Sequence, residues 1–546
     1  MSNQLKTNKQ SASAALLAAE AIQEIRQRIV GIYMFLMFAV FPLFIVDKYY
    51  NILKEKFYFF FYATLITAGI TALLGLVGLF GRAGRNKVRE KKPFLKKVGD
   101  GIKNLWHGLS LTDKFFFAFL VVVSISTAFS EWPYQAFWGN MGRYQGLLFY
   151  LTVGVAYILV TRFYRYKKMH LYAFIIAGAL VSLWGITDYF ALDLFGFHQT
   201  MGNKIDLLPF SSSIGNINTL TGLLALYMGA AAVLCIDSDK WYLTFPAMFI
   251  FVAGMVGGTS DNAVLGVACV YALTPFFAFR TGKGIYRYLF MAAMLFLGMG
   301  VMGLLTVLDT VTDSLATYPW MVGVLVGISR DHYRLLLIGA AVLLAAGFLV
   351  KKLYCGNEEG GTGPAVKIWT VIFALGVLLV AGVFIMANTG HLPEALEPFR
   401  GILVFNDEWG TYRGYAWTRL FEFFGQFPFA KKLFGSGPET YSIFMAKNYF
   451  YEMQKVVGQV FDSPHSEPLQ YLFTMGILGF VTYYGTVSAA CVQGMKQGGT
   501  ARVFAFAVVA ATAASLVNIS VPITTPLVFL SLAIAGSIKE DSEENS

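Results

Sequence analysis

The sequence predicts an all-α, polytopic membrane protein with a large helical loop on the outer side of the membrane. Of its 546 residues, 56% are hydrophobic and only 14% are charged, and the mean hydropathy is +0.59. A soluble globular chain carries about a quarter charged residues. Apolar runs of about 17 residues or more recur along the whole chain, and such helices cross lipid because they satisfy their own backbone hydrogen bonds. The main polar exception among the later runs is the stretch 389–468, which separates two of them.

We expect about fourteen transmembrane helices, with boundaries good to roughly 2–4 residues. They are predicted at 30–46, 57–80, 114–129, 145–161, 171–190, 215–236, 242–259, 262–280, 285–307, 334–350, 367–388, 469–492, 501–519 and 522–538. Residues 1–29 lack the apolar region and cleavage site of a signal peptide, so we expect a cytoplasmic helix there. The chain then divides into this N-terminal segment (1–29), transmembrane helices 1–11 (30–388), an extracytoplasmic catalytic loop (389–468), helices 12–14 (469–538) and a cytoplasmic tail (539–546).

The orientation in the cytoplasmic membrane follows from the basic residues, because cytoplasmic loops are enriched in Lys and Arg. The basic residues of alternate loops fall on one side of the membrane, which predicts cytoplasmic N- and C-termini. They are nine residues at 82–103, and Arg162, Arg165, Lys167, Lys168, Arg280, Lys283, Arg287, Lys351, Lys352, Lys367, Lys496 and Arg502. The net charge of +10 therefore indicates contact with anionic membrane lipid. Nucleic-acid binding is disfavoured, because no recognised fold or stacking aromatics accompany the charge.

The 389–468 loop is predicted to fold as a small helical cap on the outer leaflet. Tyr412, Trp417, Phe421 and Phe424 have helical spacing, and a second aromatic stretch with the same spacing covers 441–450. The sequence GSGP at 435–438 breaks the two helices.

His465 is the strongest candidate for a catalytic residue. It lies a few residues before the run 469–492, so its depth in the membrane is fixed near the lipid headgroups. A neutral imidazole titrates near pH 6.5 and can accept a proton from a hydroxyl. Asp462 and Glu467 flank it and could orient the ring, as carboxylates do for catalytic imidazoles. The alternatives are a surface histidine at a helix start capped by Ser463 or Ser466, and solvated loop carboxylates.

Two arginines are candidates for binding phosphate. Arg413 and Trp417 are four residues apart on one predicted helix face, and an arginine can pair bidentately with phosphate oxygens. The alternative for Arg413 is structural stacking on Trp417. Arg143 lies in a short outer loop that is otherwise not basic, where the alternative is an interfacial residue that packs its stem in lipid. Asn216 and Asn218 could bind sugar hydroxyls or merely cap the following helix.

Several chemistries are not indicated. The sequence has no zinc-ligand spacing, no P-loop, no serine-hydrolase elbow and no evident DxD pair in an outer loop. We therefore expect no metal and no cofactor.

The order of these residues resembles the signature of the O-antigen ligase family, which includes WaaL-type ligases and related Wzy-type polymerases. The matching stretches, in order, are GRYQGLL (142–148), GNIN (215–218), RGYAW (413–417), FP (427–428), LFGSG (433–437), PHSEPLQY (464–471) and GILG (476–479). The resemblance covers roughly residues 115–535 and is most specific in the outer loop. The chain departs from the family pattern at Ser466, where the family has Asn, and at 260–262, where SDN replaces an arginine-containing motif. It also has about two additional spans.

The resemblance implies a glycosyltransferase of GT-C-like helical architecture. The implied donor is an undecaprenyl-diphosphate-linked glycan, which an inverting, metal-independent reaction moves to a hydroxyl of a glycan, lipid, protein or wall acceptor on the outer face of the membrane. His465 would accept the proton or orient the acceptor hydroxyl, and Arg413 and Arg143 would hold the diphosphate. Further substrate-binding residues are implied by the same motifs: Trp417, Asn216, Asn218, Glu467 and Tyr471.

Three functions compete. A ligase moves a finished glycan to an acceptor, and a Wzy-type polymerase adds repeat units to a growing chain; both fit the motifs. A transporter or flippase of lipid-linked glycan would instead show charges or broken helices near the middle of the membrane. The predicted spans are nearly free of charge, and the polar residues gather in the outer loop, which favours a transferase.

Overall fold

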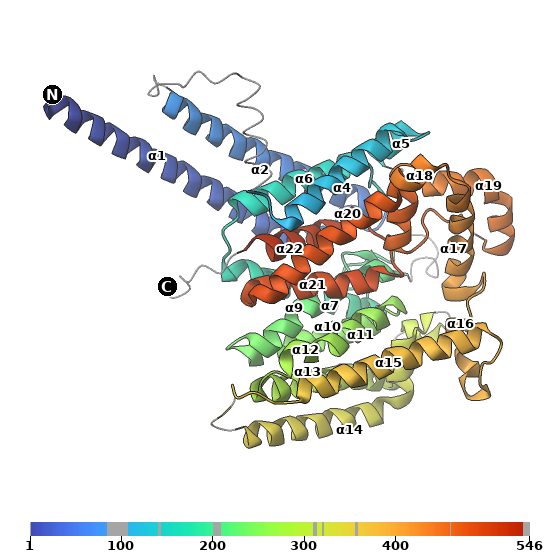
Figure 1. The fold of residues 1–546 in the computed structure, drawn as a ribbon. Helices are drawn as coiled ribbons and strands as arrows, with labels where there is room; N and C mark the ends of the chain where they lie inside the picture. The colour runs from blue at the N-terminus through green and yellow to red at the C-terminus, as the bar shows by residue number, and fades with distance from the viewer. Residues whose placement is uncertain are drawn as a thin grey trace.

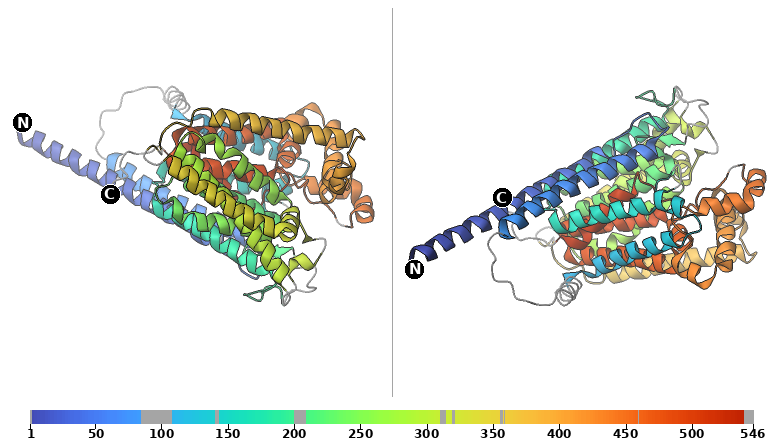
Figure 2. Two further views of the ribbon diagram at one scale, coloured as in Figure 1. Left: turned by 90° about the horizontal axis from the view of Figure 1, so that it is seen from below. Right: turned by 90° about the horizontal axis from the view of Figure 1, so that it is seen from above.

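The fold was analysed in a computed structural model of the chain, which describes residues 2–83, 108–139, 143–199, 209–309, 314–318, 321–354, 357, 359–458 and 460–538. The basic residues predicted at 85–103 and the tail 539–546 lie outside the described residues. Figures 1 and 2 show a bundle of long helices, with α1 and α2 extending from it at one end and α16–α19 gathered at the other. The structure confirms an all-α, polytopic membrane architecture.

Eight helices of the described chain are long and apolar enough to cross a membrane. They are α2 (Ile52–Ala83), α4 (Leu111–Ala128), α7 (Lys168–Tyr189), α9 (Ile217–Asp237), α13 (Gly282–Leu308), α14 (Val324–Leu353), α15 (Ala365–Asn388) and α20 (Glu467–Gln497). Shorter apolar helices account for other predicted spans: α6 (Leu147–Phe163), α10 (Phe245–Gly257) after the 3-10 turn η2 (Trp241–Leu243), α11 (Asn262–Leu273) with α12 (Pro275–Ala278), α21 (Gly499–Ser515) and α22 (Thr525–Ser537). The count of fourteen spans stays a prediction.

Burial separates the inner helices from those at the edge of the bundle. The apolar window of α9 is 89% buried, whereas that of α15 is 6% buried. Alanine and glycine along α9 allow α21 to approach closely, since a Cβ on Gly229 would stand 2.8 Å from the carbonyl oxygen of Phe506. Small residues at helix contacts are typical of membrane proteins. The leucines and valines of α15 remain exposed, as expected of a helix that faces lipid.

The first predicted span is the end of α1 (Ser2–Phe35), which continues as the π-helical turn η1 (Leu36–Val40). Lys56 of α2 is fully buried beside this turn and donates hydrogen bonds to the carbonyl oxygens of Phe41 (3.0 Å) and Pro42 (2.8 Å). The cation thus satisfies carbonyls that the helix end leaves free. A two-stranded hairpin, β1 (Phe210–Ser211) and β2 (Gly215–Asn216), leads directly into α9.

Two differences from the sequence-based expectation have a clear physical reason. Helix α14 begins at Val324, ten residues before the predicted 334, with non-helical backbone at His332. Its first turns carry Arg330 and Asp331, which form an ion pair, so an apolar pattern cannot detect them. The run 262–280 is divided at Pro275, because proline lacks the N–H that would continue the helix.

The long loop before α20 is largely helical and has a core of its own. Its helices are η5 (Glu394–Phe399), α16 (Arg400–Leu403), α17 (Trp409–Gln426), α18 (Phe429–Phe434) and α19 (Tyr441–Val456). Tyr415, Leu420, Tyr441 and Met445 are buried in this core together with Phe473 of α20. The loop is therefore packed onto the start of α20, and this packing positions the residues described below.

Remaining short elements are α5 (Pro133–Trp138), which follows α4, and the 3-10 turn η3 (Leu315–Thr317) before α14.

Candidate functional site

His465 lies in a tight turn directly before α20. Its φ is +49°, a left-handed conformation that is uncommon for residues other than glycine. Its backbone N–H donates to Ser463 Oγ (3.3 Å), and its Nδ1 lies 3.2 Å from the carbonyl oxygen of Ser463. A carbonyl oxygen can only accept, so this contact places the proton on Nδ1 and leaves Nε2 as the unprotonated nitrogen of the neutral ring. Strained backbone of this kind is concentrated at functional sites.

The surroundings of His465 keep its imidazole neutral. Burial and the positive charges of Arg143 and Arg413, against an opposing effect of Asp462, together lower the pKa of His465 to about 4. A neutral ring is the form that can accept a proton. The two arginines come from distant parts of the sequence, and both lie close enough to His465 to act on its charge.

Arg143 is bound to the His465 turn by an ion pair. Its Nε donates to Asp462 Oδ2 (2.9 Å) and its Nη2 to Asp462 Oδ1 (2.5 Å), a bidentate geometry. The Arg143 side chain is 9% exposed, so solvent screens this pair little on the arginine side. Partial desolvation opposes ionisation of Asp462, whose side chain is 51% exposed, but the charge and hydrogen bonds of Arg143 outweigh it and hold the pKa of this carboxyl below its usual range. Nη1 of Arg143 is left outside the pair.

Glu439 is a residue of this site that the sequence analysis missed. It is buried at the end of the GSGP break, with φ +59°. The pKa of Glu439 is raised to about 7, mainly by burial and also by Asp462, against the opposing charge of Arg143. Arg143, Glu439, Ser463 and Ser466 line a cavity of about 10 Å³ under the turn, room for about one water. The sequence signal that could have identified Glu439 is its position as a charged residue directly after the GSGP sequence at 435–438.

Arg413 begins the regular part of α17 after three left-handed residues, 410–412. Its Nη1 donates to the carbonyl oxygen of Gly410 (2.7 Å), and its Nε is buried without a hydrogen-bond partner among the described residues. Burial lowers the pKa of Arg413, partly offset by the charge of Asp261, but a guanidinium remains protonated at physiological pH. The result is a positively charged group with donor capacity to spare.

Trp417 connects this helix to the His465 turn. Its indole Nε1 donates a hydrogen bond to the carbonyl oxygen of Pro464 (2.8 Å). Its ring lies against Trp409 and Phe405, with centroid distances of 5.1 Å and 6.3 Å. Trp417 thus fixes the backbone next to His465 and belongs to an aromatic cluster of the loop.

The glycines of the loop have a structural role at a break in α20. Gly476 has φ +69°, which interrupts the helix and frees the carbonyl oxygens of Phe473 and Thr474. The N–H groups of Ser436 and Gly437 donate to these two carbonyls, over 3.1 Å and 2.9 Å. A Cβ on Gly435 would lie 2.3 Å from the Thr474 carbonyl oxygen, so only glycine fits there. The loop backbone thereby fills the break in the span.

The remaining predicted residues are placed at other points. The Asn216 side chain accepts from the N–H groups of Asn218 and Thr219 and caps α9. The Asn218 amide oxygen accepts from Ser260, in a polar cluster with Asn262 and Asn518. Nothing in this arrangement tests the prediction that either asparagine binds sugar.

Glu467 and Tyr471 point into the bundle. Tyr471 Oη donates to Glu467 Oε1 over 3.4 Å, and both side chains are buried. Glu467 lines a small polar cavity together with Ser515, Asn518 and Ser520. The orientation of His465 is therefore provided by the Ser463 carbonyl, and the role predicted for Glu467 and Tyr471 in substrate binding stays a prediction.

The structure also brings together three potential metal ligands that the sequence analysis did not select: Asp188, Asp193 and His198. They are spaced five residues apart, a pattern outside the usual zinc motifs.

A comparison with protein-family models identifies residues 320–484 as an O-antigen ligase domain. No curated protein matches the sequence. The matched segment contains Arg413, Trp417 and His465, while Arg143 and the two asparagines lie outside it. Together with the apolar helices, the match supports a ligase-like function in glycan transfer at a membrane. It confirms the resemblance of this chain to the O-antigen ligase family.

Proposed function

We propose that the chain is an inverting glycosyltransferase that uses an undecaprenyl-diphosphate-linked glycan as donor. The acceptor is a hydroxyl on the outer face of the cytoplasmic membrane. The observation that carries the proposal is the attachment of both arginines to the His465 turn: Arg143 pairs with Asp462, and the helix that carries Arg413 is bound to Pro464 through Trp417. Two fixed guanidinium groups beside a neutral imidazole suit a reaction that expels a diphosphate and removes one proton.

The reaction is a direct displacement. The acceptor oxygen attacks the anomeric carbon of the donor, and the bond from this carbon to the phosphate oxygen breaks. Undecaprenyl diphosphate leaves with the bonding electron pair, and its charge is stabilised by Arg413 and Arg143. Nε2 of His465 accepts the proton of the attacking hydroxyl, while the Ser463 carbonyl holds Nδ1–H in the required tautomer.

Donor binding also adjusts the base. An imidazole with a pKa of about 4 is neutral at pH 7 but is a weak proton acceptor. The negative charges of a diphosphate between the arginines offset their effect and raise the pKa of His465 toward the working range. The catalytic base is thus strengthened when the donor is present.

The break in α20 bears on the transporter alternative. Broken helices in transporters leave backbone carbonyls to coordinate ions. Here the carbonyl oxygens of Phe473 and Thr474 accept hydrogen bonds from Ser436 and Gly437, and Ser126 Oγ also donates to Thr474 O (2.7 Å). These carbonyls are occupied by the protein, which favours the transferase.

The test uses the full chain in lipid nanodiscs with a labelled undecaprenyl-diphosphate oligosaccharide. Turnover is measured as release of undecaprenyl diphosphate together with transfer of label. The acceptors are tested in separate reactions. Transfer to a second molecule of the lipid-linked oligosaccharide would indicate a polymerase, and transfer to envelope lipid or wall fragments would indicate a ligase. His465→Ala is expected to lower turnover about 10²–10⁴-fold. His391→Ala, in an exposed loop position, is the matched control. Near-normal transfer by folded His465→Ala protein would remove the proposed base.

A further inference from the structure

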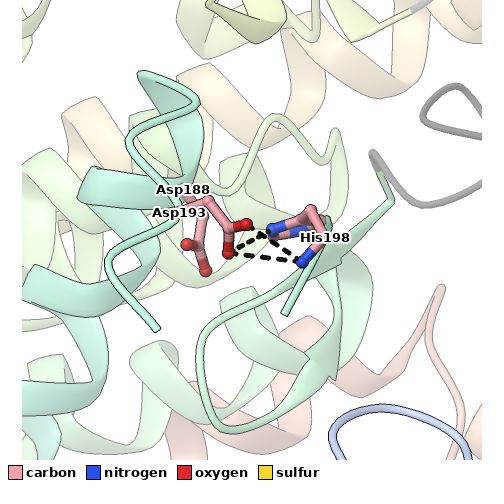
Figure 3. Close-up of side chains that lie close together, drawn as sticks. All are labelled: Asp188, Asp193 and His198. Carbon is pink, nitrogen blue, oxygen red and sulfur yellow. Dashed lines mark hydrogen bonds and ion pairs between the residues drawn. The ribbon is translucent and has the colours of Figure 1, made fainter. Parts of the chain in front are cut away.

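Asp188, Asp193 and His198 form a compact cluster at the end of α7, away from the residues assigned to glycan transfer. Each offers one ligand atom, and these atoms lie within 4.8 Å of one another. Figure 3 shows the imidazole of His198 facing Asp193, with Asp188 alongside. Asp188 comes from the last turn of α7, and the other two from the segment after it.

The hydrogen bonds of His198 determine which of its nitrogens faces the carboxylates. Nε2 lies 2.9 Å from the carbonyl oxygen of Phe210, which can only accept, so Nε2 carries a proton. Nδ1 lies 3.2 Å from Asp193 Oδ1. In a neutral ring with this tautomer, Nδ1 directs a lone pair at the carboxylate. Two electron-rich atoms at this distance require a cation between them or a second proton on the ring.

Asp188 adds a second unbalanced group. Its side chain is buried, with 6% relative exposure. Oδ2 accepts from the N–H of Ser212 (2.6 Å), but Oδ1 has no hydrogen-bond partner within the described ranges. A buried carboxylate oxygen without a partner is strongly destabilising unless a ligand satisfies it. Asp193 already accepts from the backbone N–H groups of Phe197 and His198, which hold its carboxylate in place.

We propose that Asp188, Asp193 and His198 bind one divalent cation through two carboxylates and Nδ1 of the imidazole. A mixed set of oxygen and imidazole ligands suits Mn²⁺ or Zn²⁺. The second contacts of the ligands support this role: the Phe210 carbonyl fixes the His198 ring, as partners of metal-bound histidines commonly do. Lys48 also lies near this segment, and its ammonium group donates to the carbonyl oxygen of Gly196 (3.2 Å). This single ammonium group does not replace a metal ion, because it cannot coordinate two carboxylates and an imidazole at once.

The cation would fasten the β1–β2 hairpin to α7. Phe210 and Ser212, which contact His198 and Asp188, belong to this hairpin or its turn. Phe210 pairs with Asn216, the residue that caps α9. The proposed site therefore acts on the outer end of α9 and is structural; it does not rest on the proposed function.

The experiment measures metal binding by the purified full chain in nanodiscs. After treatment with chelator and buffer exchange, the protein is titrated with Mn²⁺, followed by electron paramagnetic resonance, and separately with Zn²⁺, followed by calorimetry. We expect saturable binding of about one equivalent per chain. Asp193→Asn and His198→Ala should each weaken binding at least about tenfold. His332→Ala changes a histidine outside the cluster and should bind as wild type does.

Thermal unfolding provides a second measurement, whose main result comes from the wild-type protein and does not require that every variant folds. Added Mn²⁺ or Zn²⁺ should raise the melting temperature of wild-type protein and not that of His198→Ala, because a ligand of the folded state stabilises it. Absence of saturable binding by folded wild-type protein would overturn the proposal and assign His198 as an imidazolium paired with Asp193. Equal affinity in wild type and in both cluster variants would also overturn it.

Discussion

Trp417 donates its indole N–H to the carbonyl oxygen of Pro464, the residue immediately before His465. The bond joins α17, which carries Arg413, to the turn that carries the imidazole. Trp417 thus holds the backbone next to His465 in place, and its predicted contact with substrate stays a prediction.

The first prediction concerns this bond. Trp417→Phe keeps an aromatic ring in the cluster but removes the donor, so the Pro464–His465 turn loses one of its fixed points. We expect kcat to fall about 10- to 100-fold with little change in KM for the donor, since small misplacements of catalytic groups have effects of this size.

Trp409→Phe is the matched control, because Trp409 donates to the Ile402 carbonyl within the same loop. If both variants lost activity and thermal stability to the same extent, the role of Trp417 would be general packing of the loop.

The second prediction concerns pH. If His465 is the catalytic base, the free enzyme must have it neutral, and its pKa of about 4 places the acid-side fall in kcat/KM near that pH. The acid-side fall in kcat reports the donor complex, in which the diphosphate raises the pKa, so it should lie at higher pH. If kcat and kcat/KM fell at the same acidic pH, this would argue against a diphosphate beside the imidazole.

The same shift affects stability, with a definite sign. The pKa of His465 is lower in the folded chain than in the unfolded chain, so folding favours the neutral ring. This contribution to stability is complete above about pH 6.5 and is lost as the pH falls toward 4. Unfolding of His465→Gln, measured between these pH values, should be less sensitive to acid than unfolding of the wild type.

The third prediction concerns Arg413. Arg413→Ala should lower kcat/KM for the donor about 10²-fold or more, and Arg413→Lys should recover only part of it, because lysine lacks the planar fork. Arg400→Lys, at an exposed ion pair of the same loop, should have no effect. Full activity of Arg413→Lys would indicate simple charge attraction.

The fourth prediction concerns orientation. A reporter fused after Thr389 should be active outside the cytoplasmic membrane, and one fused after Lys91 should be active inside, as the basic loops indicate. In Figure 1, α1 begins at the end of the bundle opposite to α17 and α19, as this topology requires. A cytoplasmic position of residue 389 would exclude the proposed donor site.

The fifth prediction separates catalysis from metal binding. If arginines neutralise the leaving diphosphate, turnover should continue in excess chelator. A drop of about 10²–10³-fold with EDTA, restored by Mg²⁺ or Mn²⁺, would contradict the arginine model. The same EDTA experiment on His198→Ala identifies the metal involved. If a catalytic metal is bound elsewhere, EDTA should lower the activity of this variant as much as that of the wild type. If EDTA acts only by removing the cation at Asp188, Asp193 and His198, it should not lower the activity of the variant further.

Sequence patterns predicted the helices well because length and hydropathy determine them. The predicted run 469–492 lies within α20, and the aromatic spacing around Trp417 lies within α17. His465 and Arg413 were selected from local motifs. The pairing of Arg143 with Asp462 could not be predicted, since the two residues are 319 positions apart and no local pattern links them. Glu439 and the Asp188 cluster were missed for a related reason: burial, which gives them their chemical character, depends on the packing of other segments.

The hydrogen bonds between Ser436, Gly437 and the interrupted part of α20 have a consequence for how such proteins can be recombined. The loop and the span share one hydrogen-bond network, in which the side-chain hydroxyl of Ser126 from α4 also donates to the Thr474 carbonyl oxygen. Consider a chimera in which only the loop up to residue 468 is replaced by that of a related protein. The carbonyl oxygens of Phe473 and Thr474 would then have to accept hydrogen bonds from the residues of the other protein's loop. The smallest exchangeable unit therefore extends past the break at Gly476 and includes the end of α4, so the loop is inherited together with part of the membrane bundle.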